Sequence, residues 1–584
     1  MRAPARKAAA RGMSFSASPV LAVQLPTWRS KVTLFLLFVA FVALGVRAFW
    51  LQALSTEFLQ KKGAARYAHT LDTPAVRGKI LDRNGEVMAS SLPVKSIGAQ
   101  IRAVDADQDQ LRRLAQLLDI PLADLKKKLE TERSYVLLKR QVDDEVAEQI
   151  RALGINGIRI DPEFKRFYPA GHIAAHVLGF TNVEDKGQEG MELAQQSALG
   201  GVNGSRRVIQ DRLGRTVEDI DFIREPQDGK DLTLSIDGKI QYIAFTSLQQ
   251  AVEENHAKAG AIVVLDVKTG EVLALANMPT YNPNTRQGLS GAQLRNRVMT
   301  DTYEPGSTLK PFTIALALEK GMVKPDTILD TPAKLTIGPS TIGDSHPHAG
   351  SMSVAQIIQQ SSNVGTVRMA LRCEPREMWE MFTSVGFGQA PRFGFPGAVA
   401  GRMRPYKTWR PIEQATMSYG HGIAVSLIQV ARSYMIFARN GEMIPLSFQK
   451  LDHAPQPQRV ISEKTALQMR EMMEKVVGPG GTAPLAQVRG YRVAGKTGTA
   501  HKLENGHYVN KYVASFVGLA PASDPRIIIA VMVDEPTAGK HFGGQVAAPV
   551  FANVAASALR SLNVPPDASI TNVILPTQPV TESM

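Results

Sequence analysis

A serine and a lysine stand three residues apart in the segment EPGSTLKP, as Ser307 and Lys310 of the 584-residue chain. On a helix, residues i and i+3 share a face, so the lysine amine can reach the serine hydroxyl. A serine is a weak nucleophile at neutral pH, and a lysine becomes its base only when burial or a second cation lowers the lysine pKa from about 10.4. Apolar neighbours such as Leu309 and Phe312 predict burial of this turn. The pair therefore predicts an activated serine near a helix N-terminus.

Two further segments carry the other groups that acyl transfer by a serine requires. IIQQSSNVGT, residues 357–366, places Ser361 and Asn363 at the end of an amphipathic helical pattern. VAGKTGTA, residues 493–500, has a strand-like pattern and contributes Lys496, Thr497, Gly498 and Thr499. A serine acyltransferase needs a base, a proton route to the leaving group, donors for an oxyanion and a handle on the substrate. In this order along the chain, the three motifs supply all four.

Three other motif matches have a simpler structural interpretation. Ser447 and Lys450 repeat the serine–lysine spacing where a surface strand end is expected. Residues 268–270 repeat the Lys-Thr-Gly motif, but they lie between two apolar runs as a hairpin turn. Residues 490–497, GYRVAGKT, match the Walker A pattern of nucleotide-binding loops. Such a loop follows an apolar strand and opens a helix, and neither flank fits here, so nucleotide binding is not expected.

The composition is that of a globular chain long enough for two or more domains, with 44% hydrophobic and 21% charged residues. The net charge of +13 is weak evidence for nucleic-acid binding, because part of the excess precedes the first acidic residue, Glu57. The single cysteine, Cys373, excludes an internal disulfide and a cysteine-rich metal cluster. His346 and His348 flank a proline without a carboxylate partner, which favours a solvated loop. We expect no metal, no cofactor and no nucleic-acid partner.

An apolar run near the N-terminus occupies residues 32–46, resumes after Arg47 and continues to Leu54. Its length matches the roughly 20 residues that cross a hydrocarbon core. The basic tail before it predicts a cytoplasmic N-terminus, with the bulk of the chain outside the cytoplasm. The alternative is a cleaved signal peptide, because Ala43–Gly45 offers a small-x-small cleavage site. Arg47 either snorkels toward a headgroup or pairs with another membrane helix.

After this run the chain first has a region without an evident nucleophile, residues 56–225. Short strand-like runs alternate there with glycine-rich turns, including a hairpin signal at Asn84-Gly85. An amphipathic stretch broken at Pro121 predicts two short helices.

A second region begins near Asp228 with a strand running into a helix, followed by a strand pair at 261–277. Helical patterns dominate residues 307–437, and strands then return. Strands at both ends with helices between predict a mixed α/β domain whose sheet pairs its first and last segments. The tail from Asn563 has four prolines and little periodicity, which predicts disorder.

The ordered motifs EPGSTLKP, SSN and GKTGTA resemble those of the penicilloyl serine transferases, the superfamily of penicillin-binding proteins and serine β-lactamases. Segments 77–89, 166–180 and 187–215 look like the pedestal motifs of class B penicillin-binding proteins. Segments 418–431, 512–536 and 543–551 are similar to the septal, cell-division branch of that class. The resemblance extends from the apolar run to about residue 562.

This resemblance implies an α/β (α+β) β-lactamase-like transpeptidase domain, with an antiparallel sheet flanked by helices, an elongated pedestal and one transmembrane helix. The expected limits are a basic cytoplasmic tail (1–31), an anchor (32–54), a non-catalytic pedestal resembling a dimerisation domain (55–226), a transpeptidase domain (227–562) and a disordered tail (563–584). It also implies a D,D-transpeptidase that cross-links peptidoglycan at the division septum and is acylated by β-lactams. Its partners would be the donor and acceptor stem peptides, a polytopic septal glycosyltransferase and other division proteins of the inner membrane.

The resemblance assigns roles to matching positions. Ser307 would attack the D-Ala-D-Ala carbonyl, a neutral Lys310 would take its proton, and Ser361 would relay a proton to the departing amine. Asn363 would bind the donor peptide and position Lys310. Lys496 would supply the positive potential that keeps Lys310 deprotonated.

The remaining implied roles concern substrate binding. The hydroxyls of Thr497 and Thr499, on either side of Gly498, would bind the substrate carboxylate. The backbone N–H groups of Ser307 and Thr499 would form the oxyanion hole.

Alternatives remain open for the function of the chain and for the position of His421. No motif supplies the glutamate with which β-lactamases hydrolyse their acyl-enzyme, which favours a long-lived adduct over a β-lactamase-like hydrolase or a penicillin sensor. A membrane-tethered scaffold with a vestigial enzyme domain is a third interpretation. His421, between two glycines, is either an exposed loop histidine or a contact of the substrate groove.

Overall fold

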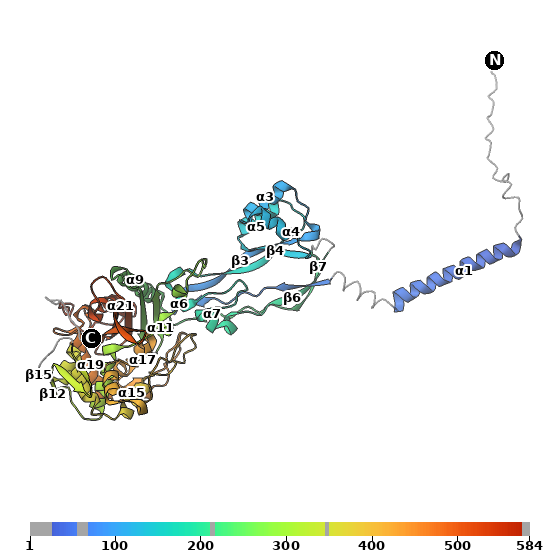
Figure 1. Ribbon diagram of the computed structural model, residues 1–584. Helices are drawn as coiled ribbons and strands as arrows, with labels where there is room; N and C mark the ends of the chain where they lie inside the picture. Colours follow the sequence, from blue (N-terminus) through green and yellow to red (C-terminus); the bar gives the residue numbers. More distant parts are fainter. Residues whose placement is uncertain (1–25, 55–67, 211–215, 345–349, 575–584) are drawn as a thin grey trace, which may run out of the picture. The chain divides into compact units, whose positions relative to one another are not determined.

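The computed structural model describes residues 26–54, 68–210, 216–344 and 350–574 (Figure 1). The chain divides into two compact units, one of residues 1–72 with 205–225 and the other of residues 73–204 with 226–584. His346 and His348, and the expected basic tail up to residue 25, lie outside the described residues.

The first unit contains one long helix and most of a small sheet. Helix α1 spans Thr27–Phe49 and continues as a short π-helical segment, Trp50–Leu54. Residues Thr27–Gln52 are long and apolar enough to cross a membrane, and an 18-residue stretch within them has a mean hydropathy of 2.4. The helix begins five residues before the apolar run at residue 32. A three-stranded sheet has the order β1 (Ala68–Thr73), β6 (Gly204–Gln210), β7 (Thr216–Arg224).

In the second unit, the part that precedes the large domain is built on the long strand β3 (Val87–Gln100), which pairs with three others. They are β2 (Ile80–Leu81), β4 (Tyr135–Val142) and β5 (Ile158–Phe167), and β8 (Leu232–Thr233) joins β2. The predicted hairpin turn at Asn84-Gly85 is confirmed, since it connects β2 to β3. The two predicted helices are confirmed as α3 (Gln108–Leu117) and α4 (Leu122–Leu129), and with α5 (Asp144–Ala152) they cover a separate apolar core.

A buried ionic cluster joins distant segments of this region. The carboxylate of Glu192, fully buried, accepts a hydrogen bond of 2.7 Å from Arg77 and another of 2.7 Å from Arg166. Removing one partner of such a cluster is costly, because it leaves an uncompensated buried charge. The cluster also joins two short helices, α7 (Gly190–Ala194), which carries Glu192, and α8 (Gln196–Leu199), because the Arg77 guanidinium donates to Gln196 as well.

A five-stranded antiparallel sheet forms the centre of the large domain. Its order is β10 (Val272–Met278), β9 (Ala259–Asp266), β21 (Ile527–Asp534), β20 (His507–Ala520), β19 (Ala494–Glu504). Pairing of β9 with β21 confirms the prediction that the first and last segments of the domain meet in one sheet. Residues 268–270 form the β9–β10 turn, as predicted.

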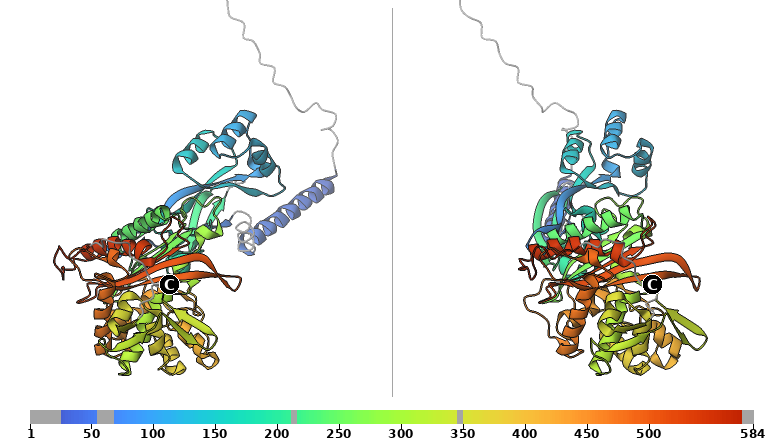
Figure 2. Two further views of the ribbon diagram at one scale, coloured as in Figure 1. Left: turned by 60° about the vertical axis from the view of Figure 1, so that its left-hand side comes forward. Right: turned by 90° about the vertical axis from the view of Figure 1, so that its left-hand side faces the viewer.

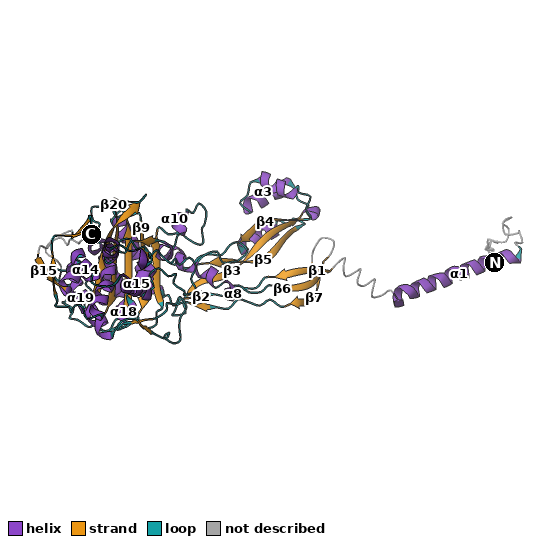
Figure 3. Ribbon diagram, turned by 60° about the horizontal axis from the view of Figure 1, so that its bottom comes forward, coloured by secondary structure: helices purple, strands orange, loops and turns teal. Residues whose placement is uncertain are grey.

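Helices cover both faces of this sheet, which explains why its central strands are continuous apolar runs (Figure 2). On one face lie α9 (Gly238–Glu254) and α21 (Ala548–Ser561), with the short α20 (Gly543–Val546) beside them. The other face carries the helical layer in which residues 307–437 fold, as Figure 3 shows in purple. Its helices are α12 (Lys310–Glu319), α13 (Val354–Gln360), α14 (Asn363–Ala370), α15 (Pro375–Ser384), α16 (Pro411–Met417), α17 (Leu427–Ser433) and α18 (Met435–Ala438), with α19 (Glu463–Val477) packed against β19.

The helical layer also contains short strands that the sequence patterns did not predict. Strand β12 (Ile328–Thr331) pairs with β15 (Gly350–Ser353), and β13 (Lys334–Ile337) pairs with β14 (Ser340–Gly343). Two-residue pairs add β11 (Thr302–Tyr303) with β16 (Val425–Ser426), and β17 (Glu442–Met443) with β18 (Gln458–Arg459). Such segments are too short to show a period in sequence.

The prediction of a disordered tail from Asn563 was wrong for residues 563–574. Asp567 accepts a hydrogen bond of 2.7 Å from the backbone of Arg492, and Asn572 donates to the carbonyl of Tyr491 at 2.9 Å. The tail forms no regular element, and it binds the loop before β19 through these side-chain contacts and through backbone hydrogen bonds to Gly490. Residues 575–584 lie outside the described residues.

Candidate active site

Ser307 lies in a 3-10 turn, Gly306–Leu309, that leads directly into α12. The predicted helix therefore begins at Lys310, while Ser307 precedes it by one turn. In a 3-10 turn residues i and i+3 eclipse each other, so Lys310 follows on the face of Ser307. Both are buried, with exposed fractions of 6% for Ser307 and 0% for Lys310. The predicted burial of this turn is confirmed.

The Ser361 hydroxyl accepts hydrogen bonds from both lysines of the predicted motifs, Lys310 and Lys496. The Lys310 amine donates to Ser361 Oγ at 3.1 Å and also to the Ser361 carbonyl, while the Lys496 amine donates to the same Oγ at 2.8 Å. Residues from α12, from the α13–α14 junction and from β19 thus converge on one oxygen. All three side chains are at most 1% exposed, so these contacts are formed away from bulk water.

The backbone at Ser361 is held in an uncommon conformation. Its φ of 63° and ψ of 38° are left-handed, which costs free energy for a residue with a Cβ. This conformation ends α13, and Ser362 then caps α14 by accepting from Gly365 N–H at 3.0 Å. The two helices are only 2 residues apart, between Gln360 and Asn363, so Ser361 and Asn363 are fixed relative to one another.

Asp344 supports this junction and was missed by the sequence reasoning. Its carboxylate accepts from the Ser362 hydroxyl at 2.6 Å and from the backbone N–H groups of Asn363 and Val364. The Asn363 amide donates to the carbonyl of Gly343 at 3.2 Å. A carboxylate at the first turn of α14 also interacts favourably with the helix dipole. No local motif marks Asp344, because it reaches the site from the end of the unpredicted strand β14.

Strand β19 is the edge strand of the sheet that faces the Ser307 turn. Thr497 shares a hydrogen bond of 2.9 Å with Thr482, and the Lys496 amine lies 3.3 Å from Thr497 Oγ1. Thr499 Oγ1 accepts from the backbone N–H of Gly543 at 3.0 Å. At Gly498 a Cβ would lie 2.9 Å from the Pro305 carbonyl, which explains why the residue between the threonines has no side chain.

The segment that matches the Walker A pattern does not have the loop and helix of a nucleotide-binding site. Residues 494–504 are a strand that is buried as far as Ala500, and the chain continues into the β19–β20 hairpin without an intervening helix. Lys496 is fully buried in a network of hydroxyls instead of following a phosphate loop. Ser447, of the second serine–lysine match, donates to the Gln449 carbonyl beside an exposed Lys450, as predicted for a strand end.

A second carboxylate missed by the sequence reasoning, Glu304, ties three segments together beside Ser307. Its carboxylate accepts from the backbone N–H of Gly422 at 2.8 Å and from the hydroxyl of Tyr508 at 3.0 Å. Burial raises the pKa of Glu304, while the two hydrogen bonds and Arg402 oppose that rise. The signal available in sequence was the position of Glu304, three residues before the serine in the same motif.

His421 belongs to this wall, so the interpretation as an exposed loop histidine was wrong. Its ring lies 5.1 Å from that of Tyr419 and 5.8 Å from that of Tyr508, measured between centroids. Burial, with the charges of Lys310 and His501, lowers the pKa of His421 to about 4. The imidazole is therefore neutral at pH 7.

Among the described residues, no three or more His, Cys, Asp and Glu side chains are grouped so that they could hold a metal ion. The site is instead built from hydroxyls, amines and amides. Such groups suit proton transfer and binding of an anion.

The comparisons with known proteins agree with this arrangement. The family model of the penicillin-binding protein transpeptidase domain matches residues 260–556, and that of the penicillin-binding protein dimerisation domain matches residues 72–234. The chain is 44% identical over 550 residues to the probable peptidoglycan D,D-transpeptidase PenA of Neisseria gonorrhoeae, covering 93% of this chain and 94% of that protein. It is 38% identical over 553 residues to the peptidoglycan D,D-transpeptidase FtsI of Escherichia coli, with the same shares. The transpeptidase domain of penicillin-binding protein 3 from Burkholderia pseudomallei aligns with a TM-score of 0.53 at 51% identity, covering 57% of this chain and 98% of that one.

Proposed function

Because this chain belongs to the penicillin-binding protein transpeptidase family, we propose that it is a peptidoglycan D,D-transpeptidase that works through an acyl-enzyme on Ser307. The observation that carries the proposal is made at the Ser361 hydroxyl. It accepts one hydrogen bond from Lys310, which follows Ser307 by one turn, and another from Lys496. Binding of β-lactams follows from the same chemistry, since a strained amide that acylates the serine mimics the donor peptide.

In the first half-reaction, Ser307 Oγ attacks the carbonyl between the last two D-alanines of a donor stem peptide. Lys310, in its neutral form, takes the hydroxyl proton, and a proton passes through Ser361 to the departing amine. The C–N bond breaks, free D-alanine leaves, and an ester joins the peptide to Ser307. In the second half-reaction, an acceptor amine attacks this ester and the serine recovers its proton, so that a new amide cross-links two stem peptides.

The geometry gives Lys496 an electrostatic role. Both amines bond to one hydroxyl oxygen, at 3.1 Å and 2.8 Å, so they lie no more than about 6 Å apart. Two ammonium groups at that distance repel by ~3 kcal/mol at an effective dielectric constant of about 20. The repulsion favours the arrangement in which one amine is neutral, and Lys310, next to the nucleophile, is the one that the reaction requires.

The substrate-binding roles rest on strand β19. We propose that the hydroxyls of Thr497 and Thr499 hold the terminal carboxylate of the donor, with Lys496 as the nearby cation. The oxyanion is proposed to form at the backbone N–H groups of Ser307 and Thr499, because the Ser307 turn packs against β19. Asn363 is proposed to contact the donor backbone from the opposite wall.

The rest of the chain suggests where this reaction takes place. Helix α1 is proposed to be a retained anchor with a cytoplasmic N-terminus, which places the transpeptidase domain in the periplasm. The relatives of the FtsI type motivate a septal location and a partnership with a membrane glycosyltransferase and other division proteins. The proposed domain limits are a tail (1–31), anchor (32–54), pedestal (55–226), transpeptidase (227–562) and C-terminal tail (563–584).

Mass spectrometry of the intact full-length chain after β-lactam treatment tests the proposal. We expect one adduct with the mass of the β-lactam, mapped to the peptide containing Ser307. Ser307→Ala should abolish it while the protein keeps its thermal unfolding temperature. Ser447→Ala, in the second serine–lysine match, is the control and should leave the adduct unchanged. An adduct that persists in Ser307→Ala would disprove the assignment of the nucleophile, and an adduct that is lost within seconds in water would favour a hydrolase.

A further inference from the structure

A cavity of about 520 Å³ opens between one end of the central sheet and the segment that leads to Ser307. One wall is made by α10 (Gly291–Leu294), α11 (Arg297–Thr300) and β11. The other wall comes from the start of β9 and from β19, β20 and β21. The volume lies within the roughly 300–1,000 Å³ of small-molecule sites.

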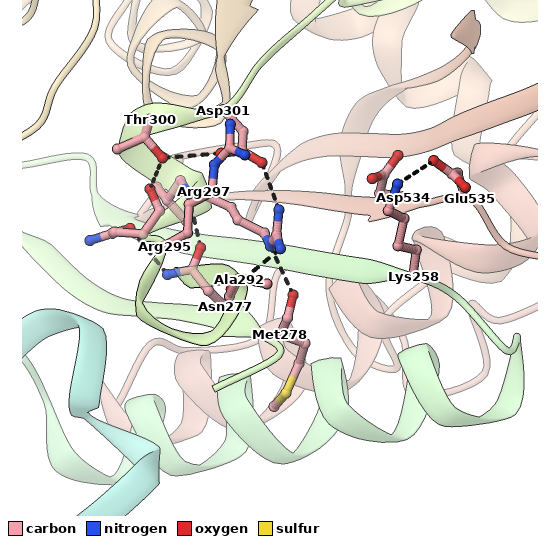
Figure 4. Close-up of polar contacts among 12 residues, drawn as sticks. Lys258, Asn277, Met278, Ala292, Arg295, Arg297, Thr300, Asp301, Asp534 and Glu535 are labelled. Carbon is pink, nitrogen blue, oxygen red and sulfur yellow. Dashed lines mark hydrogen bonds and ion pairs between the residues drawn. The ribbon is translucent and has the colours of Figure 1, made fainter. Parts of the chain in front are cut away.

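The charges around this cavity are unequally exposed. Figure 4 shows Arg295, Arg297 and Asp301 on one wall, and Lys258 with Asp534 and Glu535 on the other. The side chains of Lys258 and Arg295 are 62% and 53% exposed, whereas those of the three carboxylates are between 14% and 19% exposed. A ligand that enters the cavity therefore meets cations first.

The positive excess is concentrated at the α11 wall. The Asp301 carboxylate is shared by two guanidinium groups, forming an ion pair with Arg295 and one of 2.8 Å with Arg297. Arg297 is also held by the carbonyl of Met278 at 3.2 Å, so its position is fixed (Figure 4). One carboxylate cannot neutralise two guanidinium groups. Arg295, the more exposed of the two, keeps donors that can bind a second carboxylate in a bidentate manner.

The opposite wall is closer to neutral. Glu535 pairs with Lys258 at 2.9 Å and with Lys502, which also pairs with Asp534 at 2.8 Å. Although burial opposes it, the hydrogen bonds from Lys502 and Lys258 lower the pKa of Glu535 to about 2. The carboxylates of Glu535 and Asp534 therefore pair with Lys258 and Lys502, and the unbalanced charge of the cavity remains on Arg295.

This cavity lies within reach of the nucleophile. Tyr303, in its wall, is four residues before Ser307, so their Cα atoms are at most about 14 Å apart. Lys502, in the other wall, is three residues after Thr499 on β19, a separation of about 10 Å. An extended peptide of four residues covers the same distance.

We propose that this cavity binds a carboxylate of the acceptor stem peptide and so orients its amine toward the acyl-enzyme. The inference rests on the proposed transpeptidase function. The donor's terminal carboxylate is assigned to Thr497 and Thr499, so a second anionic site is available for the other peptide. The acceptor must carry its amine to the ester on Ser307, and an anchor about 10–14 Å away restricts its orientation. Arg295 is a positioning residue in this view, since it does not touch the reacting atoms.

The test measures acceptor use by the full-length chain in detergent with a thioester donor that ends in a D-alanine analogue. Two synthetic acceptor peptides share one side-chain amine and differ only in a free or an amidated C-terminal carboxylate. In the wild type, we expect amidation to raise the KM for the acceptor about five- to tenfold, as for loss of one charge-assisted bond at a half-exposed site. Arg295→Gln should raise the KM of the free acid to that of the amide and leave the amide's KM unchanged.

Three variants serve as controls. Arg295→Lys keeps the positive charge but lacks the planar guanidinium that binds a carboxylate in a bidentate manner. Compared with Arg295→Gln, it should recover part of the affinity for the free acid. Lys258→Gln should have a smaller effect than Arg295→Gln, because Lys258 is already balanced by Glu535. Arg376→Gln, which removes another exposed arginine paired with one carboxylate, should change neither KM.

Acylation by labelled penicillin distinguishes an effect on donor binding from an effect on acceptor binding, because the acylation step involves the donor site alone. Equal rates in wild type and Arg295→Gln support the acceptor assignment, and a slower rate in Arg295→Gln would overturn it in favour of the donor. An equal rise of KM for the free acid and the amide would also overturn it, because it would indicate a structural role. Absence of any adduct on Ser307 in the wild type would instead refute the transpeptidase function itself.

Discussion

Replacing Tyr508 by Phe removes one hydroxyl from the wall of the active site and is expected to slow acylation of Ser307. The hydroxyl donates to the Glu304 carboxylate, which also accepts from Gly422 N–H. These two bonds connect the residue three positions before the nucleophile, the loop that carries His421, and the beginning of β20. The bond from Tyr508 therefore joins the β19–β20 hairpin to the motif that presents the serine.

The expected magnitude follows from the exposure of the partners. A hydrogen bond to a charged group contributes about 1.5–3 kcal/mol when it is well buried. Tyr508 is 51% exposed, so water competes for its hydroxyl and about 1 kcal/mol is the appropriate estimate. If this bond holds the hairpin in the geometry for acylation, its loss lowers the second-order acylation constant about fivefold. Glu304→Ala should cost more, because it also leaves the Gly422 N–H without its carboxylate.

The assay is the second-order rate constant for acylation by a fluorescent penicillin, with the thermal unfolding temperature measured in parallel. Tyr512→Phe is the matched control. Tyr512 lies on the same strand, but its hydroxyl donates to the nearby Asn510 at 2.6 Å and makes no bond to Glu304. We expect Tyr508→Phe to slow acylation with little change in unfolding temperature, and Tyr512→Phe to change neither.

A double-mutant cycle shows whether the effect acts through Glu304. Glu304→Gln keeps an acceptor but removes the charge, so Tyr508→Phe should have a smaller effect in that background than in the wild type. The reasoning is refuted if Tyr508→Phe acylates at the wild-type rate, or if its effect is undiminished beside Glu304→Gln.

Three further predictions concern the stability of the large unit. Gly420→Ala should destabilise the protein by several kcal/mol and slow acylation, because at a φ of +90° its Cβ would lie 2.2 Å from the Gly306 carbonyl; thermal unfolding and penicillin labelling check this. Burial and the charge of Arg297 lower the pKa of His176 to about 4 against the hydrogen bond to Gln293. The unfolded state then binds the proton more strongly, so stability present above pH 6.5 is lost as the pH falls toward 4. Urea unfolding should show about 2 kcal/mol of loss at pH 5 that His176→Gln does not show. Glu192→Gln should cost ~3–5 kcal/mol in the same experiment, since it leaves two buried arginines without their carboxylate.

The motifs could be found in the sequence because each depends on a local spacing. The prediction of the Ser307–Lys310 pair required only the rule that residues three apart share a helix face. The prediction of Lys496 required only a strand-like pattern around a lysine. The pairing of the first and last segments of the domain in one sheet followed from strands at both of its ends. Their convergence on the Ser361 hydroxyl could not be derived, because it depends on a left-handed residue at the α13–α14 junction.

The parts that the sequence did not reveal are side chains acting over long separations. Asp344 supports the α14 turn from a strand too short to show a period, and Glu304 meets Tyr508 across 204 residues of chain. The ordered tail is of the same kind, since Asp567 reaches Arg492 through one carboxylate. Low hydrophobicity and missing periodicity predict the absence of a regular element, and they do not predict the absence of specific contacts.

In the proposed mechanism, the position of Ser361 gives a physical reason for the presence of two lysines in the site. A single buried ammonium next to Ser361 would be stabilised by the hydroxyl and the carbonyl of that residue, which opposes the effect of burial on the protonated form. A second ammonium, on β19 and bonded to the same oxygen, makes the doubly charged state unfavourable. Since the edge strand carries Lys496 and the helical layer carries Lys310, the packing of these two layers sets the repulsion. Changes that shift β19 relative to α12 should therefore alter the reactivity of Ser307 even when no catalytic side chain is replaced.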